Sequence, residues 1–498
     1  MSGHPPGTAG STTADSDQAG RVERTAAIRG GALRVIGYAC GVLVSLGTAT
    51  VLVRHLGIEG FGRYVTVTSL VALVGGVTEA GIVVHGIREF LLKADLDRRR
   101  LMGNLLAMRL TLAVVGVVLA LCFAVAIGYG QAMVIGVLVA GTGLLVQVSS
   151  DVMSVPLQAE LLLGRLTAVE LARRTLALVL IAALALLGAG LVPLLAASAL
   201  AGAAALAAIA WMVRARASLR PTFDLRAWRE LLAETSLYAI ALSIAAIYLY
   251  ATVIVMSAIA TPTQTGLFAT SFRVITAGLA IPGLLLTAIF PLMTRGRREQ
   301  PPDAGAGAIG KVLVVALICG VWMSLVTALA ASSIIDVIAG SQGRGATPVL
   351  RIQGLMFTMS FVFTAGALYL ISIRRYRPLV IASASALALN VILALVLVNE
   401  LGAEGGAIAD VVTEAVAAGG LTVVVLRSLR GHPLTLRFAG ALGLACAASG
   451  ATVLLPIGAI GRACAATIIY FSILLGTGTI PRELLEAARR LGRTRAAA

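Results

Sequence analysis

The feature of this sequence that most constrains its fold is a succession of long apolar segments separated by short, mostly basic connections. Segments of roughly 20 apolar residues match an α-helix that crosses the hydrocarbon core of a bilayer. Strands of a membrane barrel are about ten residues long and alternate in polarity, so the pattern predicts helices. We place about 14 such spans, at approximate residues 31–53, 62–86, 104–128, 132–157, 170–190, 192–213, 234–260, 267–292, 310–330, 349–371, 379–399, 406–426, 438–457 and 462–480.

The composition places the chain in the same class. Of its 498 residues, 59% are hydrophobic and 12% are charged, whereas a soluble domain is about 45–50% apolar and about 25% charged. The formal net charge of +16 lies in short clusters between the apolar segments, which is how membrane proteins mark their cytoplasmic face. We therefore expect a membrane protein that has no nucleic-acid partner.

The positions of lysine and arginine predict the orientation of the chain. With the N-terminus in the cytoplasm, roughly 33 of these residues, with Arg109 among them, belong to cytoplasmic loops, tails and span ends, which is a strong positive-inside bias. The outer side then holds Arg54, Arg63, Arg344, Arg351 and Arg462. The sequence thus predicts a multi-pass protein of the cytoplasmic membrane with both termini in the cytoplasm.

An internal repeat divides the spans into two sets of six. Gly62 and Tyr64 begin the second span, and Gly266 and Phe268 begin the eighth in the same way. Six spans separate these positions, so the repeat is parallel, about an axis along the membrane normal. We predict an all-α polytopic membrane protein with two six-helix bundles and two additional C-terminal helices. The expected segments are a disordered cytoplasmic tail (1–27), an N-terminal bundle (28–213), a cytoplasmic linker (214–233), a C-terminal bundle (234–430), two further helices (431–480) and a basic tail (481–498).

Ionisable residues inside the spans are candidates for function, because each costs about 2.5–3.5 kcal/mol at the helix centre and therefore tends to face the protein interior or a wet cavity. Arg273 lies well inside the eighth span, where it is positioned to bind a phosphate or acidic sugar; the structural alternative is an ion pair between helices. Glu79 near the end of the second span is a candidate for ion coupling, against simple pairing at the basic boundary. Asp410 and Glu414 are four residues apart on one helical face, which suits proton or cation coupling unless an arginine clamps them.

Two polar stripes extend this set. Gln147, Asp151 and Gln158 follow one another along one face of the fourth span, and Tyr250 lies on a serine-rich face of the seventh. Amides, carboxylates and aromatic rings suit a saccharide, so we take these residues as candidates for substrate binding. The alternative is that small and polar residues pack membrane helices together.

Other kinds of site are not indicated. The five cysteines lie apart in apolar segments, the four histidines are scattered, and no Gly-rich loop ending in Lys-Ser/Thr occurs. No loop contains a plausible set of nucleophile, base and acid, or is long enough for a catalytic domain. We expect no catalytic residues, no metal and no cofactor, and hence a protein that is not an enzyme.

Three segments resemble one known family. They are LGIEGFGRY from Leu56 to Tyr64, TGLFATSFR from Thr265 to Arg273, and LGAEGGAIA from Leu401 to Ala409. In this order and spacing they are similar to the polysaccharide flippases (Wzx-type transporters) of the multidrug/oligosaccharidyl-lipid/polysaccharide (MOP) exporter superfamily. The resemblance covers about residues 30–430, and implies two six-helix bundles around a central cavity, often followed by two more helices.

The resemblance also implies a function. Such a protein is a secondary transporter that flips a polyprenyl-linked glycan precursor across the membrane by alternating access, together with membrane lipids and the glycosyltransferases or polymerase of its pathway as partners. The alternative is an ion-coupled exporter of small molecules from the same superfamily. A membrane-embedded glycan polymerase or ligase is a third, weaker hypothesis, because the longest outer loop, near residues 331–348, is short.

Overall fold

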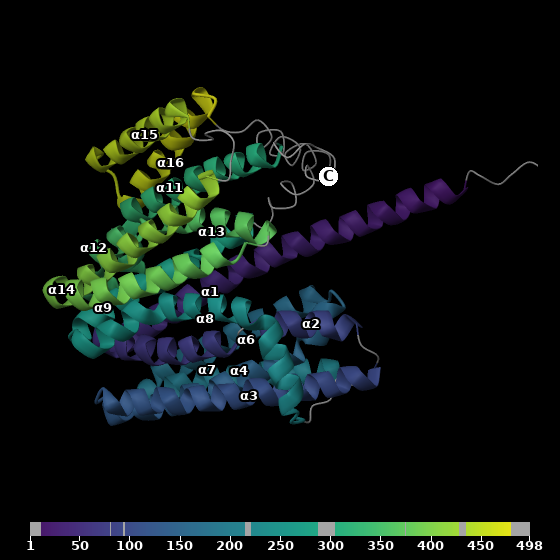
Figure 1. Ribbon diagram of the computed structural model, residues 1–498. Helices are drawn as coiled ribbons and strands as arrows, with labels where there is room; N and C mark the ends of the chain where they lie inside the picture. The colour runs from purple at the N-terminus through teal and green to yellow at the C-terminus, as the bar shows by residue number, and fades with distance from the viewer. Residues whose placement is uncertain are drawn as a thin grey trace, which may run out of the picture.

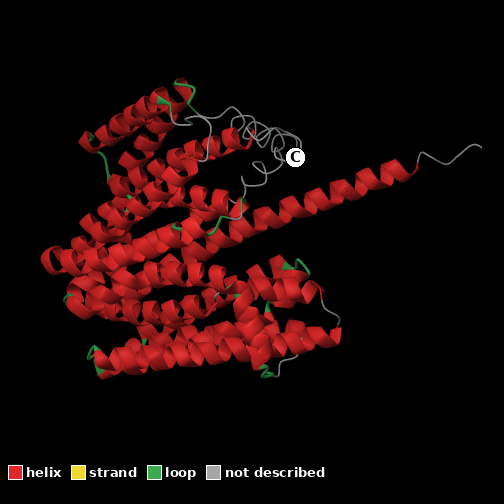
Figure 2. Cartoon of the chain, viewed as in Figure 1, coloured by secondary structure: helices red, strands yellow, loops and turns green. Residues whose placement is uncertain are grey.

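The computed structural model describes residues 11–79, 81–92, 95–214, 221–286, 304–373, 375–427 and 435–479, and all regular structure in these ranges is helical (Figures 1 and 2). The helices are α1 (Ser11–Glu79), α2 (Ile82–Leu92), α3 (Asp95–Ala126), α4 (Gln131–Met153), α5 (Val155–Ala159), α6 (Leu163–Leu186), α7 (Leu191–Val213), α8 (Leu225–Ile259), α9 (Pro262–Gly278), α11 (Ala304–Ala339), α12 (Ala346–Gln353), α13 (Met356–Ser372), α14 (Arg377–Arg427), α15 (Leu436–Gly450) and α16 (Ala459–Gly476). Short 3₁₀ turns follow α11 and α15, at Gly340–Gly343 and Ala451–Leu454.

The described helices fit the predicted count of about 14 membrane crossings. Ten helical stretches in the described residues are long and apolar enough to span a membrane. Two of these, Gly37–Glu79 and Arg377–Arg427, have 43 and 51 residues, about twice the length needed at 1.5 Å per residue. Each divides into two crossings at a glycine with positive φ, Gly57 (φ 70°) and Gly402 (φ 57°), a conformation that glycine adopts readily. The helices α6 (24 residues) and α8 (35 residues) are not among these ten; counted once each, they give the predicted 14. The predicted all-α polytopic fold is confirmed.

The chain forms two groups of helices that lie one above the other in Figure 1. The N-terminal half, α1–α7, is held by contacts of α4 with α3 and α7 and of α6 with α1 and α7. The C-terminal half, α8–α14, is held by contacts of α14 with α8 and α13 and of α13 with α11. The last two helices, α15 and α16, pack on α11 at the top of the view, so they extend the C-terminal half.

The two halves meet along α1, which packs against both α8 and α9. One close approach joins the positions that the sequence repeat predicts to be equivalent: a Cβ atom on Gly62 would lie 2.8 Å from the backbone nitrogen of Gly266. A shared hydrophobic cluster surrounds this crossing and includes Phe61 and Phe268. Nearby, Thr263 donates a hydrogen bond to Glu59 (2.7 Å). The predicted outer ends of the halves are therefore tightly joined.

Two predicted boundaries differ from the structure. Helix α1 begins at Ser11, so residues 11–27 are helical where we expected a disordered tail; four Ala, two Arg, one Gln and one Glu among these 17 residues favour helix. Helix α8 begins at Leu225, inside the expected linker 214–233, because Asp224 caps it by accepting from the backbone N–H groups of Arg226 and Ala227. The expected basic tail, 481–498, lies outside the described residues.

Candidate functional site

Arg273 lies where the two halves face each other. Its side chain belongs to α9 and is exposed, and its Nη2 donates a hydrogen bond to Ser45 Oγ of α1 (2.9 Å). Tyr64 and Tyr250, from α1 and α8, lie within electrostatic range of the guanidinium. In the described part of the chain no carboxylate forms an ion pair with it, so the pairing that was the structural alternative for Arg273 is not observed. An exposed base inside a membrane-spanning helix faces an accessible space.

A pocket beside this position contains a second base from the other half. Arg174 of α6 acts electrostatically on Arg273. Its Nε donates a hydrogen bond to Glu170 Oε1 (2.7 Å), and Arg173 donates to both oxygens of the same carboxylate. The pocket between α1 and α6 is lined by Gly37, Tyr38, Gly41, Leu166, Thr167, Glu170, Leu171 and Arg174. Arg174 is one of the roughly 33 bases that the positive-inside pattern placed on the cytoplasmic side. The spacing of Glu170 and Arg174, four residues apart on one helical face, was the available signal for this group.

Tyr38 connects the rim of this pocket to the C-terminal half. Its hydroxyl donates to the carbonyl oxygen of Ala277 in α9 (3.0 Å). The pocket and Arg273 are thus adjoining parts of the interface between the halves. Three guanidinium groups, those of Arg173, Arg174 and Arg273, and the one carboxylate of Glu170 give this region a net positive charge that suits an anionic ligand.

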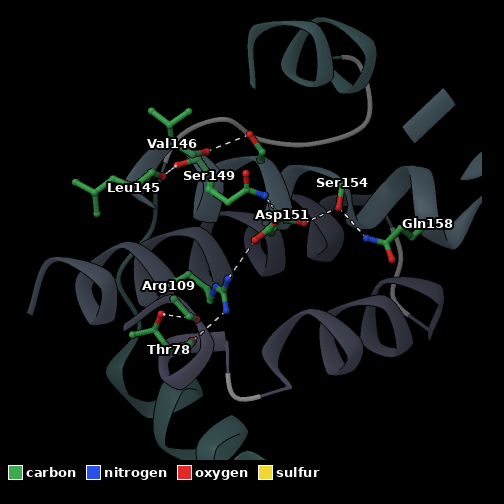
Figure 3. A network of polar contacts seen from close by, with 11 residues as sticks. Thr78, Arg109, Leu145, Val146, Ser149, Asp151, Ser154 and Gln158 are labelled. Carbon is green, nitrogen blue, oxygen red and sulfur yellow. Dashed lines mark hydrogen bonds and ion pairs between the residues drawn. The ribbon is translucent and has the colours of Figure 1, made fainter. Parts of the chain in front are cut away.

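The polar stripe of the fourth span forms a network of its own (Figure 3). Gln147 Nε2 donates to Asp151 Oδ1 (2.8 Å), Ser154 Oγ donates to the Asp151 carbonyl oxygen (2.7 Å), and Gln158 Nε2 donates to Ser154 Oγ (2.8 Å). The three candidate residues of this span therefore do lie on one face. The Asp151 side chain is 37% exposed, so it remains accessible from outside the network.

Arg109 completes this network and corrects the sequence analysis, which counted it among the cytoplasmic loop and span-end residues. It is buried in α3 with a side chain only 1% exposed, and its Nη2 lies 3.5 Å from Asp151 Oδ2. Its Nη1 donates to the carbonyl oxygen of Thr78 (3.1 Å), one residue before the end of α1 at Glu79. Glu79 itself is exposed and acts electrostatically on both Arg109 and Asp151. The structure thus brings Glu79 to the substrate-binding candidates of the fourth span.

The second pair of acids lies in the C-terminal half, packed against α8. Asp410 and Glu414 are 6% and 8% exposed. Thr252 Oγ1 donates to Asp410 Oδ1, Asn390 Nδ2 donates to the same oxygen (3.2 Å), and Gln353 Nε2 donates to Oδ2 (3.3 Å). Tyr248 donates to Glu414 Oε2 (2.7 Å). Hydroxyl and amide groups, rather than a base, therefore surround both carboxyls.

The geometry of the helices explains this second cluster. Tyr248 and Thr252 are four residues apart on one face of α8, as Asp410 and Glu414 are on α14. Helix α12 ends at Gln353, and the break before α13 directs that side chain toward Asp410 and Ser271, whose hydroxyl donates to it. Within the described residues no arginine or lysine forms an ion pair with either acid, so the clamp that was the structural alternative for this pair is not observed.

Comparison with known proteins shows the family and the fold. A family model described as "Polysaccharide biosynthesis protein" matches residues 28–297. None of the curated proteins matches the sequence. Among solved structures, the lipid II flippase MurJ in an inward closed conformation is 11% identical with a TM-score of 0.72, covering 92% of this chain and 100% of its own. An inward-facing multidrug resistance MATE family transporter of the MOP superfamily is 16% identical with a TM-score of 0.59, covering 78% of this chain and 94% of its own.

Proposed function

The chain belongs to the polysaccharide biosynthesis protein family, and from this premise we propose that it is a secondary transporter that flips a polyprenyl-linked oligosaccharide or polysaccharide precursor across the cytoplasmic membrane by alternating access. The resemblance to this family is confirmed for the first two of the three sequence segments, which lie within the matched residues 28–297, and the chain has the fold of the lipid II flippase MurJ. The glycosyltransferases and polymerase of the pathway are its proposed partners, and both termini lie in the cytoplasm.

The observation that carries the proposal is the exposed Arg273 between the two halves, which donates a hydrogen bond to a serine and, among the described residues, has no acid as its partner. The head group of a polyprenyl-linked glycan contains phosphate, and an arginine binds phosphate through two parallel hydrogen bonds. A base at this depth costs free energy unless it meets an anion or water. Arg273 is therefore the proposed phosphate site of the transport path.

The remaining candidates are assigned around this site. Tyr250 lies beside Arg273, where its ring can stack on a sugar. Gln147, Asp151 and Gln158 offer amide and carboxylate groups for sugar hydroxyls, and Asp151 keeps an exposed edge for this purpose. These residues come from both halves, so a bound head group would touch the two surfaces that alternating access must separate.

Ion coupling is assigned to the buried acids. Asp410 and Glu414 lie in a low-dielectric environment with neutral hydrogen-bond partners, which favours either a bound proton or a bound cation. Hydroxyl, amide and carboxylate oxygens, which this cluster supplies, are also the ligands of hard cations. Glu79, exposed beside the Arg109 network, is the proposed coupling residue of the N-terminal half.

The function is tested by deleting the gene and analysing the lipid-linked saccharides of the cell. The proposal predicts that one polyprenyl-linked saccharide accumulates in the inner leaflet and that plasmid-borne wild-type protein clears it. Normal lipid-linked pools together with an altered efflux of cationic dyes would favour the ion-coupled exporter instead.

A further inference from the structure

The segment that connects the two halves is hydrogen-bonded to the predicted cytoplasmic end of the N-terminal half. Thr222 donates through its backbone N–H to the carbonyl oxygen of Gly103 (3.0 Å), and Asp224 donates through its N–H to Asn104 Oδ1 (3.2 Å). Trp228 Nε1 donates to the same Asn104 oxygen. The start of α8 is thereby held against α3, and the segment from Thr222 to Trp228 has a fixed place on the molecule.

This segment and the neighbouring end of α7 expose large apolar side chains. Trp211, Phe223 and Leu225 are 66%, 71% and 73% exposed. Phe223 also contacts the ring of Trp228, with centroids 5.9 Å apart. Trp228 packs on the same hydrophobic cluster as Ile209 and Val213 of α7, so the end of α7 and the start of α8 belong to one continuous surface.

Arginines alternate with these apolar groups. Arg214 stacks over the ring of Trp211, with its guanidinium carbon 5.4 Å from the centroid, and Arg226 and Arg229 are exposed on the first turns of α8. Of the acids nearby, Asp224 is engaged in capping α8, and Glu230 is exposed. We name the exposed set Trp211, Arg214, Phe223, Leu225, Arg226 and Arg229 the linker surface; its arginines leave it with net positive charge.

We propose that the linker surface binds anionic phospholipid head groups of the cytoplasmic leaflet. Aromatic and leucine side chains at the end of a membrane helix reach the boundary between head groups and acyl chains. The arginines beside them then lie at the level of the phosphates, where each base near an anionic membrane surface strengthens association by about fivefold. Water alone would leave the aromatic and leucine side chains without an apolar partner. A purely zwitterionic membrane would leave the arginines without a net negative charge to pair with.

The consequence concerns the connection between the halves. The hydrogen bonds from Thr222, Asp224 and Trp228 attach the linker surface to α3 of the N-terminal half, while the same residues begin α8 of the C-terminal half. Anionic lipids bound here would hold the joint between the halves at the membrane plane. The inference is independent of the transported substrate.

The three tryptophans of the chain provide the test. In the Trp228→Phe/Trp322→Phe variant, Trp211 is the only tryptophan and is excited selectively at the red edge of its absorption. The protein is reconstituted in bilayers that contain brominated phosphatidylglycerol or brominated phosphatidylcholine at the same mole fraction. The proposal predicts that the brominated anionic lipid quenches Trp211 about two- to fivefold more efficiently than the zwitterionic one. Replacing Arg214, Arg226 and Arg229 by Gln removes that difference, whereas Arg344→Gln, at the predicted opposite face, keeps it.

The control reporter is Trp322, which donates to Thr467 Oγ1 (3.1 Å) where α11 packs on α16. As the only tryptophan, it should show no preference for the anionic lipid, and its emission reports that the arginine variants are folded. Equal quenching of Trp211 by the two lipids overturns the proposal even if the arginine variants fail to fold, because that comparison leaves all three arginines in place.

Discussion

At the scale of single residues, two arginines show how differently a base can be placed in a membrane-spanning helix. Arg273 is exposed and hydrogen-bonded to Ser45, so its loss leaves no buried charge without a partner. Arg109 is 1% exposed and contacts both Asp151 and the Thr78 carbonyl, so its loss removes partners from two groups. Replacing Arg273 is expected to impair transport and leave folding intact, whereas replacing Arg109 is expected to impair folding.

For Arg273→Ala we predict a loss of transport of about ten- to hundredfold, because a hydrogen bond to a charged group contributes about 1.5–3 kcal/mol. The measurement is clearance of the accumulated lipid-linked saccharide in the deletion strain at equal protein level. Arg344→Ala, exposed and close to Asp336, is the matched control and should clear normally. Full activity of Arg273→Ala would assign that residue a structural role.

For Arg109→Ala we predict a loss of about 2–4 kcal/mol in the free energy of unfolding, since the substitution removes a large buried side chain and leaves Asp151 with one partner fewer. The measurement is unfolding of the purified protein in detergent. Asp151→Asn should cost less, because the amide still accepts from Gln147 and its side chain is partly exposed. An unchanged stability of Arg109→Ala would contradict the role of this network.

Some of these site residues could be recognised from the sequence and others could not. Arg273 is recognisable because it stands alone in an apolar segment, and Asp410 and Glu414 are recognisable by their spacing of four. Arg109 was not recognised because it follows Arg98–Arg100 closely and was therefore counted with that cytoplasmic cluster. The sequence did not indicate the partners of Asp410, because polar residues of separate spans meet only through the packing of the helices. These partners are Thr252, Asn390 and Gln353.

At the scale of helices, glycines set the geometry of turns and crossings. Gly57 and Gly402 divide α1 and α14, and both lie in sequence segments that already indicate a turn. The break between α12 and α13 has no such signal, because Gly354 has ordinary helical dihedrals (φ −54°, ψ −29°). Breaks of this kind follow from tertiary packing, so the sequence predicted one uninterrupted span there.

The crossing of α1 and α9 leads to a prediction about Gly266. A Cβ atom there would lie 2.2 Å from the carbonyl oxygen of Ile58, which a side chain cannot occupy without moving the backbone. We expect Gly266→Ala to lower the free energy of unfolding by about 1–3 kcal/mol. The control is Gly419→Ala in α14, where nothing lies within 4 Å of the added atom, and which should be neutral or slightly stabilising. Equal stability of the two variants would mean that the crossing is loosely packed.

The acids of α14 give a prediction about coupling. Asp410→Asn and Glu414→Gln keep a hydrogen-bonding group of the same shape but cannot exchange a proton or balance a cation. We expect both variants to fold and to lose the acceleration of transport by an imposed proton or sodium gradient. Glu404→Gln, an exposed acid of the same helix, is the control and should keep it. A gradient response that survives in both variants would remove Asp410 and Glu414 from the coupling mechanism.

At the scale of the whole molecule, composition, span lengths and the distribution of bases were sufficient to predict an all-α membrane protein with about 14 crossings. The repeat also predicted which positions are equivalent, and the contact of Gly62 with Gly266 shows two of them meeting at the interface. The arrangement of the halves was not predictable, because it depends on contacts such as Tyr38 with Ala277 that join residues far apart in the sequence. The candidate site is made at this interface, and for that reason only its single members could be found from the sequence.

The central claim is that this chain moves a phosphate-containing, lipid-linked saccharide between leaflets, and reconstitution tests it most directly. Purified protein is placed in liposomes with a fluorescent polyprenyl-diphosphate saccharide, and a membrane-impermeant quencher is added outside. The account predicts that wild-type protein makes the inner-leaflet fraction accessible to the quencher and that Arg273→Ala protein leaves it protected, as in protein-free liposomes. Protection of the inner leaflet in the presence of folded wild-type protein would contradict the account.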